Sequence, residues 1–168
     1  FDVTICALDE APDKSISSSI REDLLSKGVR PLSVGKKDER RSYRALLKLA
    51  RMLRKERPDI VHGHCPTPST YGRAAAFLAR IPVLLSGLHN PEWVHGRRAR
   101  LKSRFQERIL RNWTDCYTAC SRAVRDWAVR GMRVPERKVR VIYNGIDTKR
   151  FAYPPGAARQ ARRRIRKE

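Results

Sequence analysis

The chain has 168 residues, of which 40% are hydrophobic and 33% charged, and its formal net charge is +21. A chain of this length can bury about 70% of its unfolded surface in one core, so a second complete domain is not required. The charge favours anionic partners such as phosphates, acidic lipid surfaces or nucleic acid, while the apolar runs are far shorter than the ~20 residues that cross a bilayer.

The hydrophobic pattern predicts alternating strands and helices along most of the chain. In chain order, we expect a strand at 2–8, a helix at 18–27, a strand at 29–34, a helix at 41–57, a buried strand at 59–62, a helix at 69–80 and a strand at 82–86. After these come a helix at about 101–113, a strand at 114–119, a helix capped by Ser121 and ending at Gly131, and a strand at 138–143. This order is typical of right-handed crossovers, so we predict an α/β fold with a doubly wound parallel sheet.

The four cysteines, Cys6, Cys65, Cys116 and Cys120, are unevenly spaced. Most lie in segments that look buried, so we expect reduced thiols packed as small hydrophobic side chains rather than a disulfide framework. Cys116 and Cys120 would be neighbours on a helix, but the predicted strand separates their Cα atoms by ~13 Å. This distance argues against a metal pair there.

Polar residues and glycines lie at or directly after the ends of four of the predicted strands. They are His62, Gly63 and His64; Gly87, His89 and Asn90; Ser121; and Asn144, Gly145 and Asp147. In a sheet of this kind, ligands bind beyond the carboxyl ends of the strands. The sequence therefore predicts a functional site at that edge.

Two other interpretations of the histidines remain open. His62 and His64 are two apart on an extended chain, ~6.6 Å between Cα atoms, and could bind a metal with His89 or His95 as third ligand. No carboxylate stands near them in the sequence to orient a ligand imidazole. Alternatively, one histidine is buried and the other is solvated at a strand end.

Several familiar motifs are absent from the sequence. It contains neither a G-x-G-x-x-G fingerprint nor a G-x-x-x-x-G-K-[ST] phosphate loop, and it has no serine nucleophile elbow. Acid–base chemistry would therefore be assigned by default to His89 or Asp147.

A set of motifs taken together resembles family-4 glycosyltransferases, in the N-terminal, acceptor-side domain of their GT-B fold. The motifs, over residues 1 to about 160, are R-P-D-I-V-H-G-H at 57–64, G-R-A-A-A at 72–76, I-P-V-L at 81–84, H-N at 89–90, T-D at 114–115 with S-R-A-V at 121–124, and V-R-V-I-Y-N-G-I-D at 139–147 with Phe151.

The resemblance implies two Rossmann-like domains facing a cleft, with a nucleotide-sugar donor held mainly by the C-terminal one. It implies sugar transfer to a carbohydrate or lipid-linked acceptor, with retention, without a bound metal and with no cofactor. His89 is then the expected catalytic residue near the donor sugar. His64, Asn90, Asn144 and Gly145 are the expected substrate-binding residues, and Asn144-Gly145 begins the passage to the second domain.

The resemblance also implies that parts of the family's fold are not in this chain. The family's first strand with its Gly-rich loop would precede Phe1, and the C-terminal domain with its paired glutamates would follow. We therefore expect residues 1–153 to form an incomplete N-terminal domain, 154–168 to start the linker or helix toward the second domain, and the chain alone to be inactive. The missing strand normally lies mid-sheet, so its neighbours would be left with unpaired backbone groups.

A basic face surrounds the predicted stripe of Leu101, Phe105 and Ile109. It comprises Arg97, Arg98, Arg100, Lys102, Arg104, Arg108 and Arg111, opposed only by Glu107. One interpretation is a solvated helix whose stripe packs on the sheet. The other is attachment to an anionic membrane surface, to which each basic residue near the leaflet contributes ~1 kcal/mol.

We accordingly expect a cytoplasmic protein, with peripheral attachment to the inner face of the membrane. The N-terminus lacks the charged start and long apolar middle of a signal peptide. Nucleic acid is a less favoured partner, because aromatic residues are only 7% of the chain and no RNA-binding or zinc-finger signature accompanies the basic residues. The alternative function is a non-catalytic anion- or nucleic-acid-binding module of the same fold.

Overall fold

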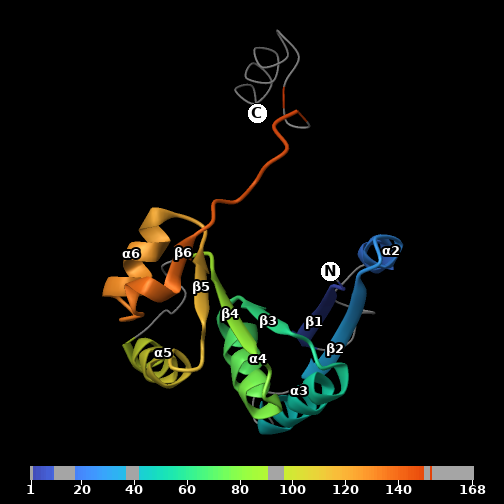
Figure 1. The fold of residues 1–168 in the computed structure, drawn as a ribbon, viewed down its shortest axis with the longest axis horizontal. Helices are drawn as coiled ribbons and strands as arrows, with labels where there is room; N and C mark the ends of the chain where they lie inside the picture. The colour runs from blue at the N-terminus through green and yellow to red at the C-terminus, as the bar shows by residue number, and fades with distance from the viewer. Residues whose placement is uncertain (1, 10–17, 37–41, 91–96, 150–151, 153–168) are drawn as a thin grey trace, which may run out of the picture.

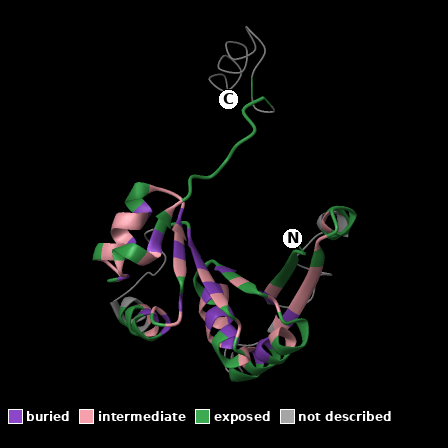
Figure 2. Cartoon of the chain, viewed as in Figure 1, coloured by how far each residue is buried: buried purple, intermediate pink, exposed green. Residues whose placement is uncertain are grey.

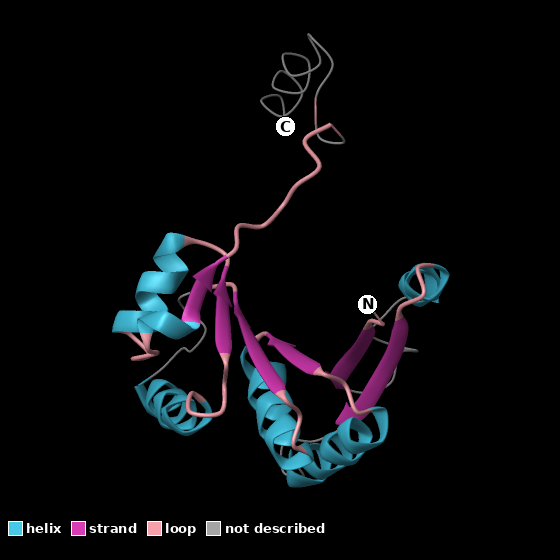
Figure 3. Ribbon diagram, in the orientation of Figure 1, coloured by secondary structure: helices cyan, strands magenta, loops and turns pink. Residues whose placement is uncertain are grey.

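The computed structural model describes residues 2–9, 18–36, 42–90, 97–149 and 152. Its strands are β1 (Thr4–Asp9), β2 (Arg30–Lys36), β3 (Ile60–His64), β4 (Val83–Leu88), β5 (Cys116–Ala119) and β6 (Val139–Val141). Its α-helices are α2 (Ser18–Ser26), α3 (Ser42–Glu56), α4 (Pro66–Ala79), α5 (Arg97–Leu110) and α6 (Arg122–Arg130), and a 3₁₀ helix, η2, spans Glu136–Lys138. Figure 1 shows their arrangement, and Figure 3 separates helices from strands.

All observed strand pairs are parallel, and helices connect the strands along the chain, which confirms the predicted α/β class. The strands nevertheless form two sheets, one of order β1-β2 and one of order β3-β4-β5-β6. β1 is drawn between β2 and β3 in Figure 1, but its only strand partner in the described chain is β2. The described strands therefore do not form one continuous sheet.

The edge position of β3 corrects one expectation. Residues 59–62 were expected to form a buried strand, but Ile60 is 52% exposed and only Gly63 of β3 is buried. A strand with a partner on one side leaves part of its surface uncovered, and its alternate backbone groups lack a strand partner.

The helices form where the apolar pattern repeats at helical spacing. In α3, Ala45, Leu49 and Ala50 are buried, while the basic residues Arg44, Arg51 and Arg54 are exposed. Small residues let α4 approach the sheet closely. A Cβ atom at Gly63 would lie 2.6 Å from the Cα of Ser69 in α4, so only glycine permits this contact between α4 and β3.

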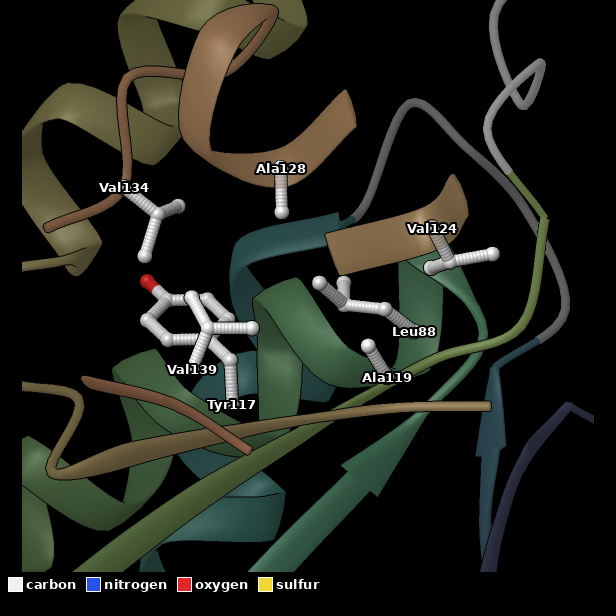
Figure 4. Close-up of a cluster of buried hydrophobic side chains, with 7 residues drawn as sticks. All are labelled: Leu88, Tyr117, Ala119, Val124, Ala128, Val134 and Val139. Carbon is white, nitrogen blue, oxygen red and sulfur yellow. The ribbon is translucent and has the colours of Figure 1, made fainter. Parts of the chain in front are cut away.

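The described residues contain two clusters of buried apolar side chains. One joins β1 and β2 to α3 and α4, and its members are Leu8, Val34, Ala45, Leu49, Ala50 and Ala75. The other joins β4, β5 and β6 to α6 and is drawn in Figure 4; it comprises Leu88, Tyr117, Ala119, Val124, Ala128, Val134 and Val139. Figure 2 shows the buried residues concentrated where helices meet strands.

The expected α6 cap is confirmed: the Oγ of Ser121 accepts a hydrogen bond from the backbone N–H of Val124 at 3.2 Å. The expected cysteine burial is wrong. Cys6 and Cys65 are exposed, and Cys116 and Cys120 are partly exposed, although all four thiols are free. None of the described helices is long and apolar enough to cross a membrane. The segment 154–168, expected to lead toward a second domain, lies outside the described residues.

Candidate active site at the carboxyl edge of β3 and β4

Three imidazoles gather at the carboxyl ends of β3 and β4. His62 and His64 lie within β3, which extends two residues beyond its predicted end, and His89 directly follows β4. The Nδ1 of His64 lies 2.9 Å from the Nε2 of His89. The ring centroids of His62 and His64 are 4.1 Å apart, and those of His64 and His89 are 5.2 Å apart. The sequence-based expectation that these residues share one edge is therefore realised.

The parallel register explains why the rings can lie so close together. His64 is paired with Gly87 across β3 and β4. A Cβ atom at Gly87 would lie 2.7 Å from the Nδ1 of His64 and 3.3 Å from the Nε2 of His62. Any other residue at this position would displace these rings, so Gly87 contributes to the site by leaving it space. The sequence placed Gly87 just after the strand predicted at 82–86, so its position inside β4 required the structure.

β5 and the residue directly after it supply further polar contacts that the sequence did not reveal. The Oγ1 of Thr118 lies 3.3 Å from the Nε2 of His62, and the Sγ of Cys120 donates to the backbone oxygen of His89 at 3.2 Å. These contacts arise because β5 is the next strand in the sheet. Their residue types alone carry no distinctive signal.

The site favours neutral imidazoles. Burial lowers the pKa of His62, and the nearby His64 and His89 lower it further. Burial also lowers the pKa of His64, to which His89 adds. Both rings are therefore uncharged at neutral pH and can exchange hydrogen bonds with hydroxyl groups or with each other.

Two of the histidines considered as metal ligands, His64 and His89, are arranged to hydrogen-bond with each other. His64 and His89 direct ring nitrogens at each other, at a distance that suits a shared hydrogen. Among the residues that the structure describes, no group of three or more His, Cys, Asp or Glu side chains is placed to hold a metal ion. His95, the alternative third ligand, lies outside the described residues.

The other expected site residues do not form part of the histidine cluster. Asn90 follows His89 and is exposed. Asn144, Gly145 and Asp147 lie in an exposed segment after β6 that runs away from the body of the domain in Figure 1. The structure thus unites the histidines but does not bring the Asn144-Gly145 pair to them. Ser121 is accounted for by its capping bond to α6.

The start of α4 was predicted at Ser69 but lies at Pro66. Cys65 occupies the cap position with a φ of 63° and no side-chain capping bond. Ser69 and Thr70 do not cap the helix: Ser69 is buried with its Oγ 2.9 Å from the Oγ of Ser86, and Thr70 donates to the carbonyl of Pro66.

Behind this edge lies a buried polar network that sequence reasoning missed. Arg73 of α4 makes two bonds to Glu107 of α5, at 2.8 and 2.9 Å, and its Nη1 also donates to Thr114 and Tyr117 at 3.1 Å. The Tyr117 hydroxyl donates to the same carboxylate. Burial alone would lower the pKa of Arg73, but Glu107 more than offsets this and the pKa is raised.

A small pocket adjoins this network, with a volume of about 40 Å³ and a lining that includes Ser69, Arg73, Ser86, Leu88 and Trp127. The space suits water rather than a sugar nucleotide. The buried ion pair therefore ties α4 to α5, and the histidine edge remains the better candidate for chemistry.

One of the two interpretations of α5, a stripe that packs on the sheet, is wrong. Leu101 is 61%, Phe105 65% and Ile109 42% exposed. The buried side of the helix instead carries Glu107 and Leu110. The physical reason is the ion pair with Arg73, which turns Glu107 inward and the stripe outward.

The basic residues of α5 are described only in part. Arg104 is exposed, and its Nη2 donates to the carbonyl of Gly131 at 3.2 Å. Arg97, Arg98, Arg100 and Lys102 lie in the same helix, but their side chains are outside what the structure describes.

In parallel α/β sheets of this kind, ligands bind beyond the carboxyl ends of the strands, and the histidines lie at that edge. The model of Glycosyltransferase Family 4 matches residues 1–150 of this sequence. The chain therefore belongs to Glycosyltransferase Family 4, and the predicted family resemblance is confirmed.

Individual relatives agree with this assignment. The chain is 26% identical over 161 residues to the Escherichia coli UDP-Gal:alpha-D-GlcNAc-diphosphoundecaprenol alpha-1,3-galactosyltransferase, covering 90% of this chain and 39% of that enzyme. It superposes on Anabaena HepE in complex with UDP-glucose with a TM-score of 0.65 at 15% identity, covering 96% of this chain and 41% of HepE. A glycosyltransferase from Rickettsia africae gives a TM-score of 0.63 at 14% identity, with 96% and 40% covered.

At these identities the structural matches show the fold, which is that of GT-B glycosyltransferases. The chain spans about two fifths of the length of each of these relatives.

Proposed function

We propose that this chain is the acceptor-side domain of an enzyme that transfers a sugar from a nucleotide-sugar donor to an acceptor hydroxyl, with retention of anomeric configuration. The main support is the cluster of His62, His64 and His89 at the carboxyl edge of the sheet in a chain of Glycosyltransferase Family 4. Residues 1–153 form this domain, 154–168 begin the connection to a donor-binding domain, and the chain alone is inactive.

In the proposed reaction, the bond between the anomeric carbon and the donor diphosphate breaks. A bond forms from the acceptor oxygen to the same carbon, and the hydroxyl proton leaves with the diphosphate or passes to solvent. His89 lies beside the donor sugar as the catalytic residue. His64, Asn90, Asn144 and Gly145 act in substrate binding, the last two reaching the site in the complete enzyme.

The names of two relatives support a choice of sugar donor and acceptor. The Escherichia coli enzyme is named for a UDP-galactose donor and a diphosphoundecaprenol-linked acceptor, and HepE was solved with UDP-glucose. We therefore propose a UDP-sugar donor and a lipid-linked acceptor for the protein that contains this chain.

The experiment is transfer by the complete enzyme, with candidate UDP-sugars and diphosphoundecaprenol-linked acceptors. Proton NMR of the first product formed reports its anomeric configuration. The proposal predicts UDP release coupled to a product with the donor's α configuration. An inverted product contradicts retention, and failure of every UDP-sugar to support transfer contradicts the donor assignment.

A specific observation also supports attachment to an anionic membrane surface through α5. Its apolar stripe, Leu101, Phe105 and Ile109, faces solvent, and Arg104 and Arg108 on the same helix are also exposed. An apolar stripe flanked by basic residues suits the headgroup boundary of an acidic leaflet. The further contacts proposed are Arg97, Arg98, Arg100 and Lys102, which would place the enzyme on the inner face of the membrane.

Co-sedimentation with vesicles tests this surface. Vesicles containing phosphatidylglycerol should retain the protein at low salt, and neutral phosphatidylcholine vesicles should not. Replacing Arg108 by Gln should weaken binding about fivefold, equivalent to ~1 kcal/mol for one charge near the leaflet. The matched control is Arg51→Gln on α3, which removes an equal charge elsewhere. Equal losses in both variants, or no binding to acidic vesicles, would contradict attachment through α5.

A further inference from the structure

The hydrogen bond between His64 and His89 links the protonation patterns of the two rings. The Nδ1 of His64 and the Nε2 of His89 are 2.9 Å apart, and the ring planes differ by 27°. Only one of these two nitrogens can carry the shared hydrogen when both rings are neutral, because the other must accept it. The tautomer of one ring therefore determines the tautomer of the other.

The surroundings hold this pair in place. His64 stands on β3 opposite Gly87 of β4, whose missing side chain leaves room for the Nδ1 of His64. On the other side of β4, the thiol of Cys120 donates to the backbone oxygen of His89. Both the side chain and the main chain of His89 are thus engaged by neighbouring strands.

The protonation state of His64 is compatible with a hydrogen bond between the two imidazoles. The groups facing His64 are His62 on its own strand and His89 after β4, while the Thr118 hydroxyl of β5 lies beside His62. Burial first, and then His89, lower the pKa of His64, so the ring is neutral at pH 7. The Nδ1 of a neutral His64 can either donate this hydrogen or accept it, so its role is tied to that of the Nε2 of His89.

We propose that His64 is a positioning residue, which holds His89 through its Nε2 so that His89 presents its Nδ1 to the substrate. This inference rests on the proposed role of His89 in sugar transfer and deepens it. The substrate-binding role proposed for His64 is thereby made specific: His64 acts on the substrate through His89. The atom of His89 that meets the donor sugar is Nδ1, because Nε2 is already bonded.

The pairing is tested by NMR on the chain with ¹⁵N-labelled histidine at pH 7.5. In the unmodified chain, one ring hydrogen should correlate with nitrogens of both His64 and His89, and His89 should be a single tautomer. His64→Phe keeps a ring but has no nitrogen, so His89 should become a mixture of tautomers. Absence of the shared hydrogen in the unmodified chain would overturn the proposal without any variant.

Two further variants sharpen the test. His64→Asn places an amide near the former Nδ1 and should restore the single tautomer of His89. His62→Phe replaces the neighbouring imidazole by a ring without nitrogens, leaves the bond between His64 and His89 intact, and should leave the tautomer unchanged. Gly87→Ala should act like His64→Phe, because its Cβ would lie 2.7 Å from the Nδ1 of His64. A His89 signal that is unaffected by His64→Phe would contradict the pairing.

Turnover of the complete enzyme tests the positioning role. His64→Phe should lower kcat on the order of 10- to 100-fold with little change in KM for the donor, the effect of a misplaced reacting group. His64→Asn should recover most of that loss. Equal losses in the two variants would overturn positioning. If instead the tautomer shifts but His89→Ala turns over normally, the proposed function fails while the pairing stands.

Discussion

At the residue scale, the partial burial of His62 and His64 makes the stability of the fold sensitive to acid. Burial lowers the pKa of His62 and His64 below the unfolded value of about 6.5, so between these values the unfolded chain binds more protons than the folded chain. Their contribution is complete above about pH 6.5 and is lost as the pH falls through that window.

We therefore expect the urea midpoint of the protein to fall between pH 7.5 and 5.5, and to fall less in the His62→Gln/His64→Gln variant. Comparing the two proteins at each pH removes the contribution of the carboxylates, which both share. Parallel pH profiles for the two proteins would show that these imidazoles do not titrate differently on folding.

The buried pair of Arg73 and Glu107 should dominate the local energetics. Arg73 is 3% exposed, and removing Glu107 would leave its charge unpaired in the core. We expect Glu107→Gln to lower the free energy of unfolding by about 3–5 kcal/mol.

Urea unfolding measures this loss. The matched control is Glu136→Gln, which breaks the exposed pair with Arg125 and should cost about 1 kcal/mol or less. Equal costs at the two sites would contradict the structural assignment of Glu107 to the core. The double variant Arg73→Met/Glu107→Leu should be more stable than Glu107→Gln, because it leaves no charge unpaired.

At the scale of the elements, α5 shows what periodicity can and cannot predict. The repeat of Leu101, Phe105 and Ile109 correctly predicted a helix. It suggested the wrong buried face, because apolar spacing carries no information about a distant arginine. The contact of Glu107 with Arg73, 34 positions earlier, decides the orientation.

This orientation predicts opposite responses on the two sides of α5. Phe105→Ser should change the free energy of unfolding by no more than about 0.5 kcal/mol, as expected for an exposed side chain, while reducing binding to acidic vesicles. Leu110→Ala, on the buried side, should cost about 2–5 kcal/mol. Urea unfolding of both variants gives the comparison. A larger loss for Phe105→Ser would place the stripe in the core.

Strand positions could be predicted better than strand ends. β3 continues through His64 because it pairs with β4 as far as Gly87, and such pairing is invisible in one segment of sequence. The same register creates the contact between His64 and His89. Motif resemblance could therefore identify these two residues, whereas the hydrogen bond between them required the sheet.

At the scale of the whole molecule, the fold class followed from the alternation of strands and helices. The alternation alone does not predict the division of the described strands into two sheets. The expectation of a missing strand came from the family resemblance and stays a prediction. The fold places three imidazoles at one edge and an apolar, basic helix on the surface. The proposed transferase function rests on the first of these features, and the proposed attachment to a lipid surface rests on the second.

We propose that His89 acts at the reaction centre. The most direct test compares turnover with nucleotide binding in the complete enzyme. His89→Ala should lower kcat by on the order of 100-fold or more, while Kd for UDP, measured by calorimetry, should change less than about threefold. A variant that loses turnover and UDP affinity equally would show that His89 serves nucleotide binding, and the proposed catalytic role would be contradicted.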